Sequence, residues 1–155
     1  IMRKIQKILF PTDFSRESKP AMELAIEMAQ KFGAHLTLLH VWTDPLYIGA
    51  VGNAYALAPE VLAQAQEEAE HALEKLRLEV AKAGVPVKAI TLEGIAADVI
   101  LAMAHSQNMD LIVMGTHGRS GLKRFFLGSI AEQVLRAAEC PVLTVRPPAD
   151  NVQKL

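Results

Sequence analysis

The chain has 155 residues, of which 51% are hydrophobic and 21% are charged, and its formal net charge is -1 at pH 7. These values exclude a disordered chain and predict one compact domain, residues 1–155, with a single core. They also exclude the global positive field that holds a protein on nucleic acid or on an anionic membrane, so we expect neither as a partner.

The first residues and the cysteine usage both bear on localisation. Residues 1–7 alternate basic and apolar side chains, without the continuous apolar stretch of a signal peptide, and no later segment is long enough to span a bilayer. Cys140 is the only cysteine, which excludes an intrachain disulfide and a cysteine-based metal cage. We therefore expect a cytoplasmic protein, with Cys140 buried as a small apolar group.

Five short runs rich in Val, Ile and Leu alternate with longer stretches of helical periodicity. This alternation is typical of an α/β fold in which an open five-stranded parallel sheet has helices on both faces. We expect strands at residues 7–11, 35–42, 87–92, 111–115 and 142–145. Besides a first helix that ends at Gly33, we expect helices at residues 59–84, 95–106 and 129–138.

Three segments outside these elements carry expectations of their own. Ser15 or Ser18 is suited to cap the first helix. Residues 43–58 form a link that is too long for an ordinary strand-to-helix connection, and we interpret it as a lid or binding flap. Residues 147–155 begin with two prolines and should form a loose tail outside the packed structure.

A glycine-rich loop follows the fourth expected strand and leads into the last helix. It runs from Gly115 to Ser129 in the sequence GTHGRSGLKRFFLGS. Ligands of open parallel sheets sit at the carboxyl ends of the strands, where the next helix presents unpaired N–H groups, and glycine lets an anion approach the backbone closely. Ser129 also begins a capping-box pattern with Glu132, so its hydroxyl either caps the helix or turns toward a phosphate.

The spacing of this loop matches a known pattern. Gly115, Gly118, Gly128 and Ser129 satisfy G-x2-G-x9-G-[S/T], and the chain resembles the universal stress protein family over nearly its whole length. The opening ILFPTDFS and the closing CPVLTV strengthen the resemblance. It implies a Rossmann-like, adenine nucleotide alpha hydrolase-like fold with strand order 3-2-1-4-5. Because the glycine pattern is complete, the chain is similar to the branch that binds ATP.

The resemblance also implies which residues surround the nucleotide. Adenine and ribose contacts fall on Pro11, Thr12, Asp13 and Val41. Residues around the ribose and the phosphates are Met114, Gly115, Gly118, Gly128, Ser129 and Ile130. The histidines share no metal-ligand spacing, so the sequence predicts no metal site formed by the protein itself. A magnesium or manganese ion would instead be bound through the phosphates of ATP.

Several of these positions have two readings. The Asp13 carboxylate at the end of the first strand can accept a hydrogen bond from a ribose hydroxyl or cap the following turn, and the two roles can coexist. Among the basic loop residues, Arg119 is the one we favour as a phosphate contact; a solvated loop face is the other reading. His117 can contact a phosphate or act as an acid or base near pH 7, but the sequence identifies no partner for it, and we favour a plain loop residue.

The last expected strand, Val142–Val145, falls at the end of the strand order, and an apolar edge invites pairing with a second chain. The resemblance likewise implies a homodimer through this strand. Our first functional hypothesis is an ATP-binding regulatory protein of the stress response with at most slow hydrolysis and no catalytic residues. The alternatives are an ATPase or nucleotidyl transferase on the same fold, and a nucleotide-free dimeric interaction module.

Overall fold

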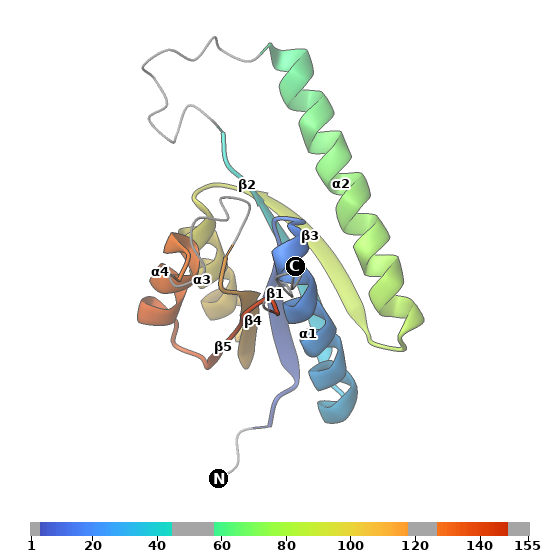
Figure 1. The fold of residues 1–155 in the computed structure, drawn as a ribbon, viewed down its shortest axis with the longest axis vertical. Helices are drawn as coiled ribbons and strands as arrows, with labels where there is room; N and C mark the ends of the chain where they lie inside the picture. Colours follow the sequence, from blue (N-terminus) through green and yellow to red (C-terminus); the bar gives the residue numbers. More distant parts are fainter. Residues whose placement is uncertain (1–3, 45–57, 118–126, 149–155) are drawn as a thin grey trace, which may run out of the picture.

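The computed structural model describes residues 4–44, 58–117 and 127–148 (Figure 1). Strands and helices alternate along the chain, as the sequence predicts. The order is β1 (Lys7–Pro11), the 3₁₀ turn η1 (Arg16–Ser18), α1 (Lys19–Phe32), β2 (His35–Trp42), α2 (Pro59–Lys82), β3 (Val87–Glu93), α3 (Ala96–Ser106), β4 (Leu111–Gly115), α4 (Ser129–Ala137) and β5 (Val142–Val145).

The five strands form one parallel sheet in the order β3-β2-β1-β4-β5, which confirms the expected Rossmann-like arrangement. β1 lies at the centre, where Ile8 pairs with Leu36 of β2 on one side and with Leu111 of β4 on the other. The chain first builds outward from β1 to β3 and then crosses to β4. The order of the strands therefore reverses between β1 and β4, the position at which open parallel sheets bind ligands.

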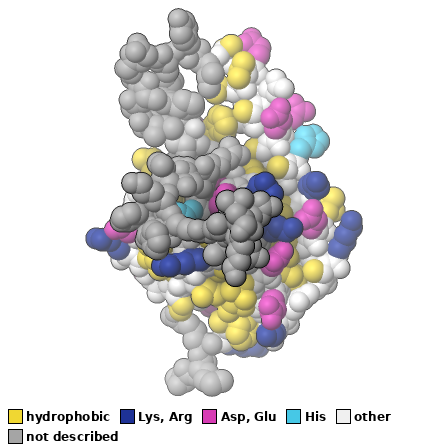
Figure 2. Space-filling view, viewed as in Figure 1, with side chains coloured by type: hydrophobic (Ala, Val, Ile, Leu, Met, Phe, Trp, Pro, Cys, Tyr) yellow, Lys and Arg dark blue, Asp and Glu magenta, His cyan; other side chains and the backbone are white. Residues whose placement is uncertain are grey.

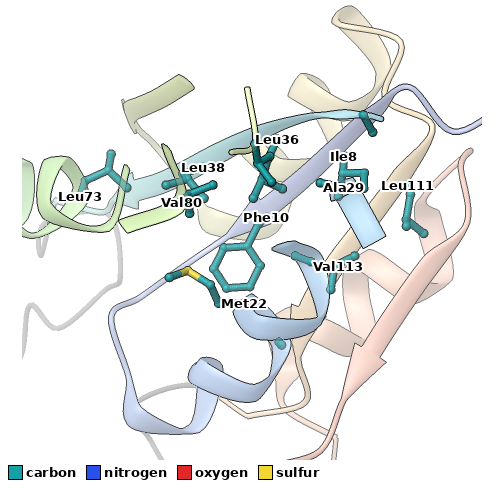
Figure 3. Packing of buried hydrophobic residues seen from close by; sticks show 14 residues of the cluster. Ile8, Phe10, Met22, Ala29, Leu36, Leu38, Leu73, Val80, Leu111 and Val113 are labelled. Atoms are coloured by element: carbon teal, nitrogen blue, oxygen red, sulfur yellow. The ribbon is translucent and has the colours of Figure 1, made fainter. Parts of the chain in front are cut away.

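Both faces of the central strands are buried, which explains their continuous apolar sequences. Ile8 and Phe10 face α1 and α2 in the core that Figure 3 shows, whereas Leu9 between them faces the cluster beneath α3 and α4. All three side chains are completely buried. Figure 1 shows the same layers, with α1 and α2 on one side of the sheet and α3 and α4 on the other. The ends of β1 and β4 are thus held by packing on two sides.

The predicted end of α1 at Gly33 agrees with the structure, whereas the other predicted helix ends differ from it. Gly33 adopts φ 63° after α1, and its N–H donates to the carbonyl oxygens of Ala29 and Gln30. Ser18 occupies the N-cap position of α1, but its side chain makes no capping hydrogen bond and its Oγ instead donates to the carbonyl oxygen of Ser15. The other element limits shift by one or two residues: α2 ends at Lys82, β3 continues to Glu93, α3 begins at Ala96 and α4 ends at Ala137.

Most of the expected flap and of the expected tail, residues 45–57 and 149–155, lies outside the described residues. Within residues 4–44, 58–117 and 127–148, none of the helices is long and apolar enough to cross a membrane. On the face drawn in Figure 2, lysine and arginine side chains lie interspersed with aspartate and glutamate.

Candidate functional site

A cleft of about 370 Å³ opens at the carboxyl ends of β1 and β4. Its walls come from both sides of the point where the strand order reverses. The expected nucleotide-contact residues that the structure describes all line it: Pro11, Thr12, Asp13, Val41, Met114, Gly115, Gly128, Ser129 and Ile130. The remaining two, Gly118 and Arg119, lie outside the described residues. The sheet topology therefore brings together residues that are more than 100 positions apart in the sequence.

A tight turn after β1 presents Asp13 to the cleft. The Thr12 hydroxyl oxygen accepts the N–H of Phe14 at 3.0 Å, and the Asp13 carboxylate accepts the N–H of Ser15 at 3.0 Å. Phe14 takes up a left-handed φ of 63°, which turns the chain sharply toward η1. Asp13 therefore stabilises the turn and also lines the cleft.

His40 supports this turn from β2. Its Nδ1 donates to the carbonyl oxygen of Thr12 at 3.0 Å, and its ring stacks on Phe14 with 4.6 Å between the ring centroids. Thr12 is held further by its own N–H, which donates to the carbonyl oxygen of Leu39. Sequence reasoning considered His40 only as a metal ligand. The alternation of side chains along β2 could have indicated the face on which His40 lies, because it turns Leu39 and Val41 toward α3 and His40 toward the opposite face.

Short backbone contacts form the wall on the β4 side of the cleft. Gly128 N–H donates to the carbonyl oxygen of Thr116 at 2.7 Å, and Thr116 N–H donates to the carbonyl oxygen of Val145 in β5. A Cβ at Gly128 would lie 3.0 Å from the Thr116 oxygen, whereas the nearest atom of the described residues to a Cβ at Gly115 would be 3.5 Å away. Neither glycine has a positive φ. Close backbone approach is therefore what favours glycine at position 128.

The capping-box prediction for Ser129 is wrong. Gly128 is the N-cap of α4 and its carbonyl oxygen accepts the first intrahelical N–H, from Glu132, at 2.9 Å. Ser129 consequently occupies the first helical position, where its hydroxyl makes no capping hydrogen bond. Glu132 extends along the helix to Arg136, with 2.8 Å between their charged groups. The first N–H groups of α4 have no partner within the helix. The residues of this first turn, Ser129, Ile130 and Ala131, line the cleft.

His117 and Thr116 line the same wall of the cleft. Thr116 is 4% exposed and its Oγ1 lies 2.9 Å from His117 Nδ1. His117 Nε2 is buried and has no hydrogen-bond partner among the described residues. Among the described residues, no group of three or more His, Cys, Asp or Glu side chains could hold a metal ion. Cys140 is half-buried against the cluster beneath α3 and α4, away from this cleft.

β5 forms one edge of the sheet, as expected, and pairs with β4 from Ile112↔Val142 to Gly115↔Val145. All four of its residues are half-buried. Because Val145 also accepts the N–H of Thr116, the edge strand and the cleft wall share a hydrogen bond.

Comparison with known proteins supplies an independent result. Residues 4–146 match the model of the universal stress protein family. Universal stress protein MJ0531 of Methanocaldococcus jannaschii is 38% identical over 92% of this chain and 83% of its own, and a universal stress protein of Thermus aquaticus is 39% identical over 90% and 97%. The solved structure of universal stress protein UspA from Lactobacillus plantarum superposes with a TM-score of 0.80 at 29% identity, covering 94% of this chain and all of the other.

Two further solved structures contain nucleotides. A universal stress protein in complex with cAMP has a TM-score of 0.70 and covers 94% of this chain and 99% of the other. The Archaeoglobus fulgidus protein in complex with dAMP has a TM-score of 0.65 and covers 93% of this chain and all of the other. Each is 20% identical to this chain, a likeness that extends to the fold alone.

Proposed function

The chain belongs to the universal stress protein family, and we propose that it is an ATP-binding regulatory member of that family. The observation that carries this proposal is the cleft at the reversal of the strand order. It combines a carboxylate, an apolar wall and a helix N-terminus in about 370 Å³, a volume within the range of small-molecule sites.

The chemistry of the two walls fits the two halves of a nucleotide. Leu39, Val41 and Ile100 form an apolar surface suited to a purine ring, and Asp13 beside them suits the ribose hydroxyls. Across the cleft, the first turn of α4 offers unpaired N–H groups and the positive end of the helix dipole. Phosphate oxygens are the ligands that this arrangement favours.

The glycine pattern makes the proposal specific for ATP. Gly115, Gly128 and Ser129 line the cleft at the spacing of the ATP-binding branch of the family, and Gly118 completes the pattern. We propose Arg119 as an additional phosphate contact and Mg²⁺ or Mn²⁺ as an ion bound through the phosphates. The complexes of fold relatives with cAMP and dAMP make an adenine nucleotide a reasonable ligand for this cleft.

Mass spectrometry of the purified chain under native conditions tests the ligand class. The proposal predicts a co-purifying adenine nucleotide, or binding of added Mg-ATP by the nucleotide-free protein. A clean chain that also ignores added ATP would contradict it and would favour an interaction module without nucleotide.

We further propose that ATP acts as a regulatory ligand and that the purified chain hydrolyses it slowly at most. Asp13 accepts the N–H of Ser15 within the turn, and His117 Nδ1 lies against Thr116. Neither contact resembles a general base oriented toward an attacking water. Rapid phosphate release by the purified protein alone would instead support the ATPase alternative, and adenylate transfer would support the transferase.

The proposed assembly is a cytoplasmic homodimer through β5. An apolar edge strand with unpaired backbone groups favours pairing with a second copy, and β5 lies at the edge of the sheet. Cys140 is the only cysteine in the sequence, which fits a reducing compartment.

A further inference from the structure

The hydrogen bonds between β4 and β5 show which backbone groups of β5 face the open edge of the sheet. Ile112 N–H donates to the carbonyl oxygen of Pro141, and Thr116 N–H donates to that of Val145. The N–H and C=O groups of successive residues in a strand point to alternate sides, so residues 141, 143 and 145 face β4. Residues 142, 144 and 146 therefore present their backbone groups to the open edge.

This alternation limits how a second copy can pair with the edge. In a symmetric pair the two β5 strands run antiparallel, and the residues that exchange hydrogen bonds face the edge in both copies. The register that uses the whole strand centres on Thr144 and sets Val142 opposite Arg146 of the second copy. The next allowed register centres on Leu143 and sets Arg146 opposite Cys140. Both registers bring the arginine of one copy to the amino end of β5 in the other.

The Arg146 side chain belongs to the face of the sheet that α3 and α4 cover. Val142 packs against the cluster beneath these two helices, whereas Leu143 and Val145 pack against the core beneath α1 and α2. Side chains two residues apart share a face, so Thr144 and Arg146 follow Val142. Arg146 is exposed and forms no ion pair with another described residue.

A cavity of about 330 Å³ lies on the same face, at the amino end of β5 and between the ends of α3 and α4. Glu139 and Asp110 line it, and none of its described lining residues is a lysine or an arginine. The Asp110 carboxylate already accepts the backbone N–H groups of Gln6 and Lys7. Glu139 lies 2.9 Å from His105 Nδ1 and its side chain is 78% exposed, so it can accept further bonds. The C-terminal ends of two helices also attract a cation.

We propose that Arg146 of a second copy enters this cavity and pairs with Glu139, so that a dimer contains two equivalent ion pairs. The contact rests on the proposed homodimer and adds a register and a charged residue at each end of the β5 pair. A guanidinium suits the position, because its fork of donors can bind a carboxylate with two parallel hydrogen bonds.

Charge reversal at the two positions tests the contact. Arg146→Glu and Glu139→Arg each place two pairs of like charges in the dimer, so the Kd for dimerisation should rise about tenfold in each variant. Sedimentation equilibrium measures this Kd. Lys88→Glu, on the opposite edge strand β3, changes the net charge as Arg146→Glu does. This control should leave the Kd within about twofold of the wild type.

An equimolar mixture of the two reversed variants distinguishes the contact from an indirect effect. In a mixed dimer both pairs carry opposite charges, one in the original sense and one reversed. Native mass spectrometry of the mixture should therefore show the mixed dimer well above its statistical share. Glu139 and Arg146 are exposed, so both variants should fold, which thermal unfolding checks.

The other outcomes contradict the contact. A statistical mixture, or reversed variants that dimerise as tightly as the wild type, would overturn it. An equal loss of dimer in Lys88→Glu would assign the effect to net charge and would also overturn it. A monomeric wild type would refute the homodimer itself, and binding of Mg-ATP by that monomer would leave the nucleotide proposal standing.

Discussion

His40 Nδ1 donates a hydrogen bond to the carbonyl oxygen of Thr12, with 3.0 Å between the two atoms. The same ring stacks on Phe14, a residue with a left-handed φ of 63°. A histidine of β2, on the opposite face of the sheet from Val41, thereby fixes the turn that presents Asp13 to the cleft. The orientation of Asp13 depends on a side chain that does not line the cleft.

Replacing His40 should therefore weaken nucleotide binding from a distance. In His40→Leu the Thr12 carbonyl loses its donor and Phe14 loses its stacking partner, which should lower the free energy of unfolding by about 1–2 kcal/mol. ATP affinity should fall severalfold because the turn becomes less ordered. Calorimetric titration and urea unfolding measure the two effects. His40→Asn, whose amide nitrogen stands near the position of Nδ1, is the matched control and should keep more of the ATP affinity.

Asp13→Asn tests the ribose contact with little change in the turn. Asparagine retains a side-chain oxygen that can accept the N–H of Ser15, so the midpoint of thermal unfolding should remain within a few degrees. It removes the charge, and hydrogen bonds to charged groups are stronger by about 1 kcal/mol, so ATP should bind about fivefold more weakly. An Asn variant that binds ATP as tightly as the wild type would show that Asp13 serves the turn alone.

The glycines of the cleft should differ in their tolerance of a methyl group. Gly128→Ala directs a Cβ to 3.0 Å from the Thr116 carbonyl oxygen, a backbone atom that already accepts the Gly128 N–H. We expect a loss of about 1–3 kcal/mol in the free energy of unfolding. Gly115→Ala meets no atom of the described residues closer than 3.5 Å, and Gly115 has no positive φ, so the substitution should be neutral or stabilising by up to about 1 kcal/mol. Urea unfolding of the two variants compares them, and equal effects would contradict the close-approach argument.

A lysine on β5 tests the proposed dimer. Thr144 is half-buried on the edge strand, opposite Met114 of β4, and Thr144→Lys adds a charge of the kind that blocks edge-to-edge pairing. Light scattering at micromolar concentration should give the dimer mass for the wild type and the monomer mass for this variant. Thr91→Lys, on the opposite edge strand β3, is the control and should remain dimeric. A wild-type chain that is already monomeric would exclude the β5 interface.

The sequence predicted the sheet well because its strands carry strong local signals. The continuous run Ile8-Leu9-Phe10 is typical of a strand buried on both faces, and such a strand belongs at the centre of a parallel sheet. Element limits differ by one or two residues from the prediction: α2 ends at Lys82 with Ala83 as its C-cap, before the glycine that ends the periodic pattern.

The site was harder to predict than the fold, because part of it depends on contacts between distant segments. The glycine spacing identified the wall formed by Gly115 and Gly128. The hydrogen bond from His40 to Thr12 joins residues 28 positions apart, and the strand alternation indicates only the face of the sheet on which His40 lies, not its partner. The capping role predicted for Ser129 is wrong, because a capping-box pattern does not reveal which residue begins the helix. Gly128 accepted the first intrahelical bond and displaced the serine by one position.

Thermal unfolding with and without Mg-ATP tests the central claim, that the cleft between β1 and β4 binds ATP, most directly. A ligand that binds only the native state at 100 times its Kd adds about 2.7 kcal/mol, which for a chain of this size raises the unfolding midpoint by roughly 5–10 °C. We predict such a rise with Mg-ATP and a clearly smaller one in Asp13→Asn at the same ATP concentration. A midpoint that stays constant up to millimolar Mg-ATP would contradict the claim.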